Sequence, residues 1–285
     1  MTTEERQTNI KNAKKLFTSL QSKCVRFCAE HQCVRIRPTP DSKEWRSVGG
    51  MLEQIQRIFY WDYNYFRART RTRKRKSESS ALMLAEKRRI GTDGMELGKQ
   101  IDEEANVFVT RCVLLGENVD EAMEDMTLYT RKLIAAKKLW GWQPLVAQYA
   151  IAIPALSIGT CIDSLEVDAD YKLIAVEHKY GYQEYLYSSN ANMDGPLQDI
   201  SNCPLNQHFL QVGMATLILE AIYNVKVHRA FVVYVDDYEV RPHELPSWFH
   251  ERRKDIWEAF VNGMAKRLPT SEAKSPARRQ RLPRQ

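Results

Sequence analysis

The sequence lacks a continuous apolar run of the length that a membrane helix requires, which is roughly 20 residues. Its most apolar window, Leu145–Ile162, is interrupted by Gln148 and Pro154, and we interpret this window as strands of a buried core. The first residues, Met1–Asn12, are polar and contain no apolar stretch of the kind that directs secretion. We therefore expect an intracellular protein that does not associate with membranes.

Cysteine is also scarce. The chain has 6 cysteines among 285 residues, scattered along the sequence, and this is too few for a disulfide framework. One close group, formed by Cys24, Cys28, His31 and Cys33, has none of the paired spacings that zinc sites use. We therefore predict ordinary thiols at these positions and no zinc site.

Acidic residues are outnumbered by basic ones, 36 against 42, which gives a net charge of +6. The excess lies in the clusters Arg67–Lys76 and Lys274–Arg284. Such clusters suggest a polyanionic partner or a nuclear-localisation signal, with a solvated surface as the alternative, and we favour a nuclear over a cytoplasmic protein. In the first cluster we predict that six residues bind nucleic acid: Arg69, Arg71, Arg73, Lys74, Arg75 and Lys76. Phosphate contacts alone do not distinguish DNA from RNA.

The spacing of apolar residues changes along the chain. Helical spacing predicts helices over residues 2–30, 51–66, 82–89, 96–115 and 120–138. Strand patterns follow over 145–153, 157–167 and 171–178, and then a helix over 205–223, a strand over 227–235 and a helix over 247–268. This order predicts an α/β fold. We expect a basic helical N-terminal region over 1–80, a core over 81–268 and a disordered basic tail over 269–285.

Charged residues occur where two of these strands are expected to end. Asp163 lies in the segment GTCIDSL, and Glu177 and Lys179 lie in LIAVEHK. Residues two apart on a strand face the same side, so Glu177 and Lys179 point together and His178 points the other way. A buried strand that ends in a charged pair is costly unless the charges meet a metal or a ligand.

An antiparallel hairpin of residues 158–165 and 171–178 would place Asp163 across from the Glu177 end of its partner strand. Mg²⁺ prefers hard oxygen ligands, and Asp163, Glu177 and the backbone carbonyl of His178 would form a partial shell for it. Mn²⁺ is expected to substitute. Lys179 would orient or deprotonate the attacking water. Glu-x-Lys alone is most often surface charge, so the prediction depends on the combination.

These segments resemble the PD-(D/E)XK nuclease superfamily, in particular the branch of lambda exonuclease and the RecB-like nucleases. The likeness covers roughly residues 91–235 and implies a restriction-endonuclease-like core, with a central mixed sheet flanked by helices. In the segment GKQIDEEA, Asp102 would take the place of the family's upstream metal-binding acid, with Glu103 as the alternative. Gln211 matches the Gln on the helix after the Glu-x-Lys strand, and Gln207 is a nearby competitor.

The chain departs from the family pattern in three ways. Asp102 stands where this branch often has Glu, and His178 stands where many members have an apolar residue. We expect the His178 side chain to be buried and hydrogen-bonded on the far face of the strand, with no catalytic role. Some relatives hold an iron–sulfur cluster, but no Cys follows Cys203, so none is expected here.

The resemblance implies a Mg²⁺-dependent nuclease with Asp102, Asp163, Glu177, Lys179 and Gln211 as catalytic residues. DNA is the favoured substrate, with exonuclease action on duplex ends in recombination, repair or viral DNA processing. One alternative is an endonuclease of a mobile element or virus that acts on DNA or RNA. Another is a nucleic-acid-binding protein without catalysis. A homo-oligomer is compatible with each reading.

Overall fold

The computed structural model describes residues 25–28, 33–36, 94, 96–153, 156, 158–181, 186–187, 189 and 192–265. The predictions for the basic run Arg67–Lys76, for the helices over 51–66 and 82–89 and for the tail over 269–285 lie outside the described residues. Among the residues that are described, no helix is both long and apolar enough to span a membrane.

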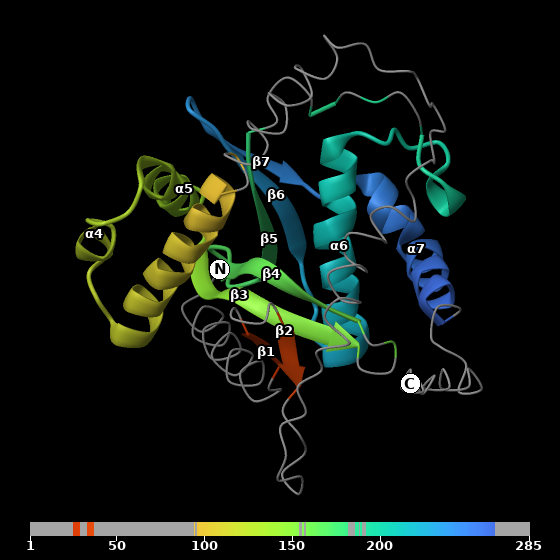
Figure 1. The fold of residues 1–285 in the computed structure, drawn as a ribbon, viewed down its shortest axis with the longest axis horizontal. Coiled ribbons are helices and arrows are strands. Elements are labelled where there is room, and N and C mark those ends of the chain that lie inside the picture. Colours follow the sequence, from red (N-terminus) through yellow and green to blue (C-terminus); the bar gives the residue numbers. More distant parts are fainter. Residues whose placement is uncertain are drawn as a thin grey trace, which may run out of the picture.

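Five strands form one mixed sheet in the order β3-β4-β5-β6-β7 (Figure 1). Their bounds are β3 Gln143–Ile153, β4 Ile158–Val167, β5 Leu173–Tyr180, β6 Arg229–Val235 and β7 Val240–Glu244. β5 and β6 are parallel, and the other neighbours are antiparallel. The four strands predicted from the sequence are confirmed, with ends that differ by one or two residues.

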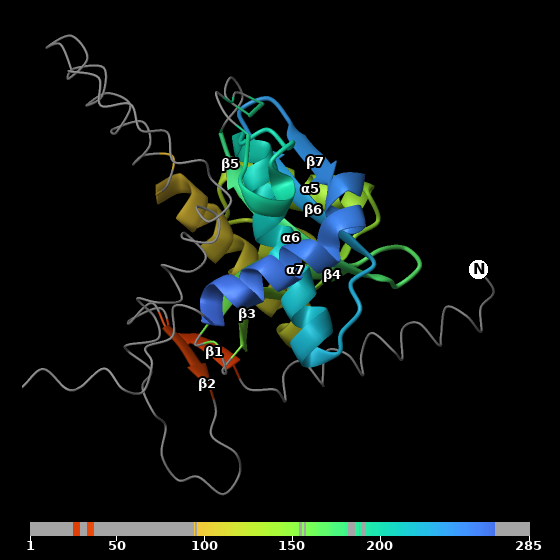
Figure 2. The same ribbon diagram turned by 90° about the vertical axis from the view of Figure 1, so that its right-hand side faces the viewer.

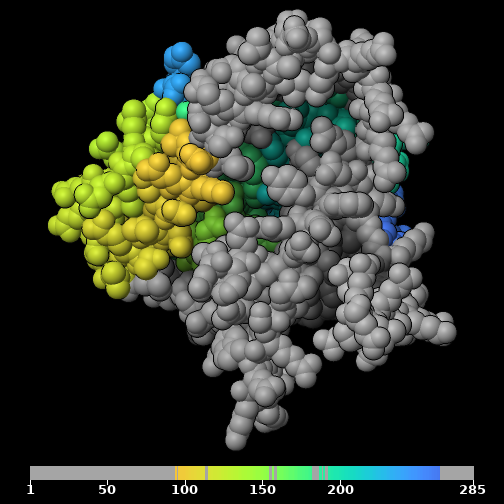
Figure 3. All heavy atoms as spheres, viewed as in Figure 1, coloured from red at the N-terminus to blue at the C-terminus, as the bar shows by residue number. Residues whose placement is uncertain are grey.

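Helices cover both faces of this sheet, so the predicted α/β class is confirmed. α6 (Pro204–Tyr223) and α7 (Ser247–Ala265) cover one face, and Figure 2 shows them in front of the strands. The helix of residues 96–109 and α5 (Leu128–Leu139) cover the other. Their atoms, coloured yellow to yellow-green, form the surface on the left of Figure 3. The remaining described helical elements are short: η2 Thr110–Leu115, α4 Val119–Ala122 and η4 Gly195–Leu197.

The apolar run at the start of β5 is buried on both sides. Leu173 and Ala175 belong to the core cluster that contains the α6 residues, and Ile174 and Val176 belong to a second cluster with Ile101 of the opposite helix layer. A strand with helices on both faces is expected to be continuously apolar. The charged residues that follow this run therefore begin inside the protein.

Two predicted elements differ from the structure. The single helix predicted over 120–138 is two helices, α4 and α5, because Thr127 acts as the N-cap of α5 and accepts a 3.4 Å bond from the Thr130 N–H. The carboxylate of Glu104 accepts the Thr127 N–H at 2.9 Å and so fixes the break from the neighbouring helix. Ser, Thr and Asp side chains favour such helix starts.

Strands also occur where none was predicted. β7 has the sequence VRPHE, and Pro242 within it weakens the strand signal, although a proline is tolerated on an edge strand. In the N-terminal region the structure describes only β1 (Val25–Cys28) and β2 (Cys33–Ile36), which pair as an antiparallel hairpin. The helix predicted over 2–30 is therefore wrong at residues 25–28, where β-branched and aromatic residues favour a strand.

Candidate metal and catalytic site

The site forms where β4 and β5 stop pairing. Their ladder ends at the pair Ser164 and Val176, and the next residues towards the open end are Asp163 and Glu177. β5 continues to pair with β6 as far as Tyr180. The antiparallel arrangement predicted for β4 and β5 is confirmed, and it brings the two acids to one end of the hairpin.

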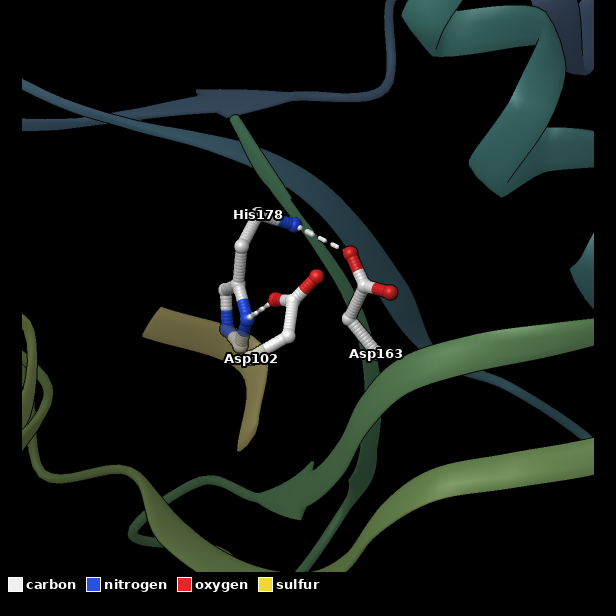
Figure 4. A group of neighbouring side chains, drawn as sticks. All are labelled: Asp102, Asp163 and His178. Carbon is white, nitrogen blue, oxygen red and sulfur yellow. Dashed lines mark hydrogen bonds and ion pairs between the residues drawn. The ribbon is translucent and has the colours of Figure 1, made fainter. Parts of the chain in front are cut away.

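Asp163 occupies the fork between these strands. Its Oδ2 accepts a 2.8 Å hydrogen bond from the backbone N–H of His178, as Figure 4 shows. Gln148 of β3, with a left-handed φ of 49°, places its Nε2 3.4 Å from Oδ1 of Asp163. One oxygen of the carboxylate thus accepts a hydrogen bond from a backbone N–H, and the other lies next to a side-chain amide.

Asp102 approaches the same point from the helix of residues 96–109. Its Oδ1 lies 3.4 Å from Nδ1 of His178 (Figure 4). Ligand atoms of Asp102, Asp163 and His178 all lie within 4.8 Å of one another. Glu103 is exposed on the same helix. Of the two upstream acids left open by the sequence, Asp102 is the one at the cluster.

Glu177 and Lys179 lie on the opposite face of β5 from the His178 side chain, as predicted. Glu177 is buried, and its Oε1 accepts hydrogen bonds from the Lys179 ammonium and from Nε2 of Gln211 on α6. Gln207 instead donates to Oδ1 of Asn202 at 2.6 Å. Gln211 is therefore the glutamine that α6 brings to the site.

Burial raises the pKa values of all three acids, and a neighbouring carboxylate adds to the rise in each. Burial is the main cause that raises the pKa of Asp102 to about 6, against the opposing charges of Lys179 and Lys137. The pKa of Asp163 is raised by burial and then by Asp102, and that of Glu177 is raised well above its usual range by burial and then by Asp163. Without a bound cation, the ionised forms of these carboxyl groups are therefore disfavoured.

The nearby ammonium group offsets only part of this charge. Burial alone would lower the pKa of Lys179, but the charges of Glu177 and Asp163 outweigh burial and raise it above its ordinary value. The ammonium therefore stays charged at neutral pH. Even with Lys179 nearby, the pKa values of Asp102, Asp163 and Glu177 stay raised, and a divalent ion bound by carboxylate oxygens would favour the ionised forms.

The His178 imidazole is buried and hydrogen-bonded, as predicted. Its Nε2 lies 2.8 Å from the Lys137 Nζ, and an ammonium can only donate, so Nε2 accepts and the ring proton lies on Nδ1, facing Asp102. Burial and then the charge of Lys137 lower the pKa of His178 to about 3, so the ring is neutral. A protonated Nδ1 offers no lone pair to a metal. The backbone carbonyl of His178 remains the more suitable ligand.

The sequence reading missed the polar residues behind the site. The Lys137 ammonium also binds Glu166, whose Oε1 accepts a 2.7 Å bond from Ser164. The sequence does contain a sign of these buried polar residues. Ser164 and Glu166 are two apart on a strand, so they place two polar side chains on one face that would otherwise be apolar.

No family model matches this chain, and no curated protein sequence matches it. Chains of solved structures do match. One is described as "Crystal structure of SSO0001", with 12% identity, 57% of this chain and 74% of that chain covered, and a TM-score of 0.25. A TM-score this low carries no argument about fold or function.

Proposed function

We propose that this protein is a Mg²⁺-dependent nuclease that hydrolyses phosphodiester bonds in DNA. The observation that carries the proposal is the group formed by Asp102, Asp163 and His178, whose ligand atoms lie within 4.8 Å of one another, next to the buried Glu177 and the charged Lys179. Strongly perturbed ionisable groups gathered at one point are typical of catalytic sites. The resemblance to PD-(D/E)XK nucleases supports the same assignment.

The restriction-endonuclease-like type of the core is part of this proposal. Three antiparallel strands, β3 to β5, precede α6, which crosses over to the parallel strand β6. The two acids lie on adjacent strands, and Gln211 lies on the crossover helix. This order of elements agrees with what the resemblance implies.

Asp102 and Asp163 would hold the ion together with the Oε2 of Glu177, because Oε1 of Glu177 already accepts two hydrogen bonds. The His178 N–H faces Asp163, and the carbonyl of an extended residue lies on the same edge as its N–H, which favours this carbonyl as a further ligand. A divalent ion bound there supplies Lewis acidity, which acidifies a water and offsets charge on the scissile phosphate.

Lys179 would act on the water and the phosphate directly. Since its ammonium stays charged, it can donate hydrogen bonds that orient the attacking water, and its charge stabilises the negative charge that develops on the phosphate oxygens. Gln211 is a positioning residue. Its amide holds Oε1 of Glu177 and so fixes the rotamer of that carboxylate.

The predicted phosphate contacts complete the proposal. The basic run Arg67–Lys76 would supply affinity that does not depend on sequence. We propose exonuclease action on duplex ends in recombination, repair or viral DNA processing, in the nucleus. Incubation of the protein with linear duplex, circular duplex, single-stranded DNA and RNA, each with and without Mg²⁺, tests the activity and separates the exonuclease from endonuclease and RNA-cutting readings.

Matched variants test the site itself. Asp102→Asn should lower Mg²⁺-dependent cleavage at least about a hundredfold, since loss of roughly 3 kcal/mol of transition-state stabilisation has that effect. Glu103→Gln, one residue along and exposed, should cleave like the wild type. Equal activity of both variants, or no cleavage of any substrate by the wild type, would contradict the proposal, and the second result would favour a binding protein.

A further inference from the structure

A cavity of about 210 Å³ lies on the other face of the sheet from α6, between the helix of residues 96–109, α5, and strands β3 and β4. Most of its wall is apolar, with Phe108, Leu133 and Trp142 among the larger side chains. Lys138 and Gln143 also line it and are exposed. The cavity is therefore reachable from the surface.

One wall of this cavity contains a buried carboxylate. Glu166 has 0% of its surface exposed. Its Oε1 accepts bonds from the Lys137 ammonium and from the Ser164 hydroxyl. Its Oε2 is buried and has no hydrogen-bond partner in the part of the chain that the structure describes. Buried carboxylate oxygens are rarely left unbonded, because the lost hydration is costly.

Water alone is a poor partner for this oxygen. An ordered water in a protein needs two to four polar contacts. Here Ser164 already donates to Oε1 of Glu166, and the Lys137 ammonium lies against both Glu166 and His178. Most of the other lining side chains are apolar. A molecule with one donor and an apolar body satisfies both parts of the cavity.

We propose that this cavity binds a small aromatic molecule of one or two rings whose single N–H or O–H group donates to Oε2 of Glu166. An engineered apolar cavity of about 150 Å³ holds benzene, so the larger volume here suits a bicyclic ring. Lys137 already balances the charge of Glu166. The donor on the ligand is therefore neutral and not a second cation.

This site is separate from the carboxylate cluster, although the two are neighbours. Lys137 contacts Glu166 on the cavity side and Nε2 of His178 on the other. A chain of contacts runs from the Glu166 carboxylate through Lys137 and His178 to that of Asp102. Binding in the cavity is measured directly, so the test does not depend on whether the protein cleaves DNA.

Indole and indene are the probes, because they share a shape and only indole carries an N–H. Each is titrated into the full chain and followed by calorimetry. Indole should bind at least about tenfold more tightly than indene, since a site with an unpaired buried acceptor discriminates against an analogue that lacks the donor. Equal affinities, or no binding of either probe at millimolar concentration, would overturn the proposal, and neither result requires a variant.

Two variants then locate the binding site. Ala105→Leu adds apolar volume at the cavity wall and should abolish binding of both probes. Glu166→Gln should reduce the preference for indole to less than about threefold, because an amide oxygen accepts more weakly than a carboxylate. Glu124→Gln, on the exposed surface, is the control and should leave the preference unchanged. Undiminished indole binding by a folded Ala105→Leu protein would show that the probe binds elsewhere.

Discussion

The backbone N–H of His178 donates a 2.8 Å hydrogen bond to Oδ2 of Asp163, one residue beyond the last pair between β4 and β5. In a continuous ladder this N–H would meet a backbone carbonyl of β4. The fork exposes the N–H, and the Asp163 carboxylate takes the place of the carbonyl. The position of the acid is therefore set by the place at which two strands separate.

We predict that Asp163→Asn abolishes cleavage while the fold survives. The amide oxygen of Asn can still accept the His178 N–H, so the fork keeps its hydrogen bond, but the charge that a metal needs is lost. Cleavage in Mg²⁺ should fall at least about a hundredfold, which corresponds to roughly 3 kcal/mol. Metal binding measured by calorimetry should weaken in parallel, and near-normal turnover would remove Asp163 from the site.

Lys179 should contribute to chemistry more than to binding. Its ammonium faces Glu177, whereas we expect the more numerous arginines and lysines elsewhere to supply phosphate affinity. Lys179→Ala should therefore bind duplex DNA within about threefold of the wild type and lose cleavage at least about a hundredfold, because it acts in the transition state. The measurement is a DNA titration in Ca²⁺, followed by cleavage in Mg²⁺.

A different outcome in that experiment would change the role of the residue. Loss of DNA binding by Lys179→Ala, with metal affinity unaffected, would make Lys179 a phosphate contact. Gln211→Ala is a comparison variant, since Gln211 donates a hydrogen bond to the same oxygen of Glu177 as Lys179 does but carries no charge. It should reduce turnover less than Lys179→Ala and leave DNA binding intact.

Helix packing behind the site depends on one glycine. A Cβ added to Gly213 of α6 would overlap the ring of Phe249 on α7, with ring atom Cδ2 only 3.0 Å away. Gly213→Ala should lower the free energy of unfolding by roughly 1–3 kcal/mol, because the helices must move apart. Gly98→Ala is the matched control. Nothing lies within 4 Å of that position, so it should gain up to about 1 kcal/mol from helix propensity, as urea unfolding would show.

Much of the sheet could be predicted because its signals are local. The apolar run LIAV predicts a strand buried on both faces, and a polar turn before it predicts the hairpin. β7 could not be found in this way, since VRPHE carries few strand-forming residues and its edge position comes from pairing with β6. The split between α4 and α5 depends on Glu104, more than 20 residues away in the chain.

Helical geometry alone could have predicted that Asp102, and not Glu103, lies at the site. Ile101, Ala105 and Phe108 form one buried stripe of the helix. At 100° per residue, Glu103 points almost directly away from this stripe, whereas Asp102 lies at its border. The contacts from Asp102 through His178 to Lys137 could not be predicted from the sequence, because they join three elements whose packing no local pattern specifies.

The affinity of the site for metal should rise with pH. Burial is the main reason that the pKa of Asp102 is about 6, and below this pH a metal ion must displace the proton. Mn²⁺ affinity measured by calorimetry should therefore fall up to about tenfold for each unit below pH 6 for each proton displaced. Glu124→Gln, on the exposed surface, should show the same profile as the wild type, and a flat profile in the wild type would contradict the assignment of Asp102.

When no metal is present, the contribution of the Asp102 carboxyl group to folding stability should fall as pH rises, whereas metal affinity should rise. The folded pKa of Asp102, about 6, is raised above the ordinary value of 3.8, so between these two values the folded state binds the proton more tightly than the unfolded chain. Its contribution to stability is therefore full below about pH 4 and is lost as pH rises through 6. In EDTA, the melting temperature of the wild type should therefore fall relative to that of Asp102→Asn as the pH rises from about 4 to above 6.

Saturating Mn²⁺ at pH 7 should raise the wild-type melting temperature and have little effect on Asp102→Asn, because a ligand stabilises only the folded state that binds it.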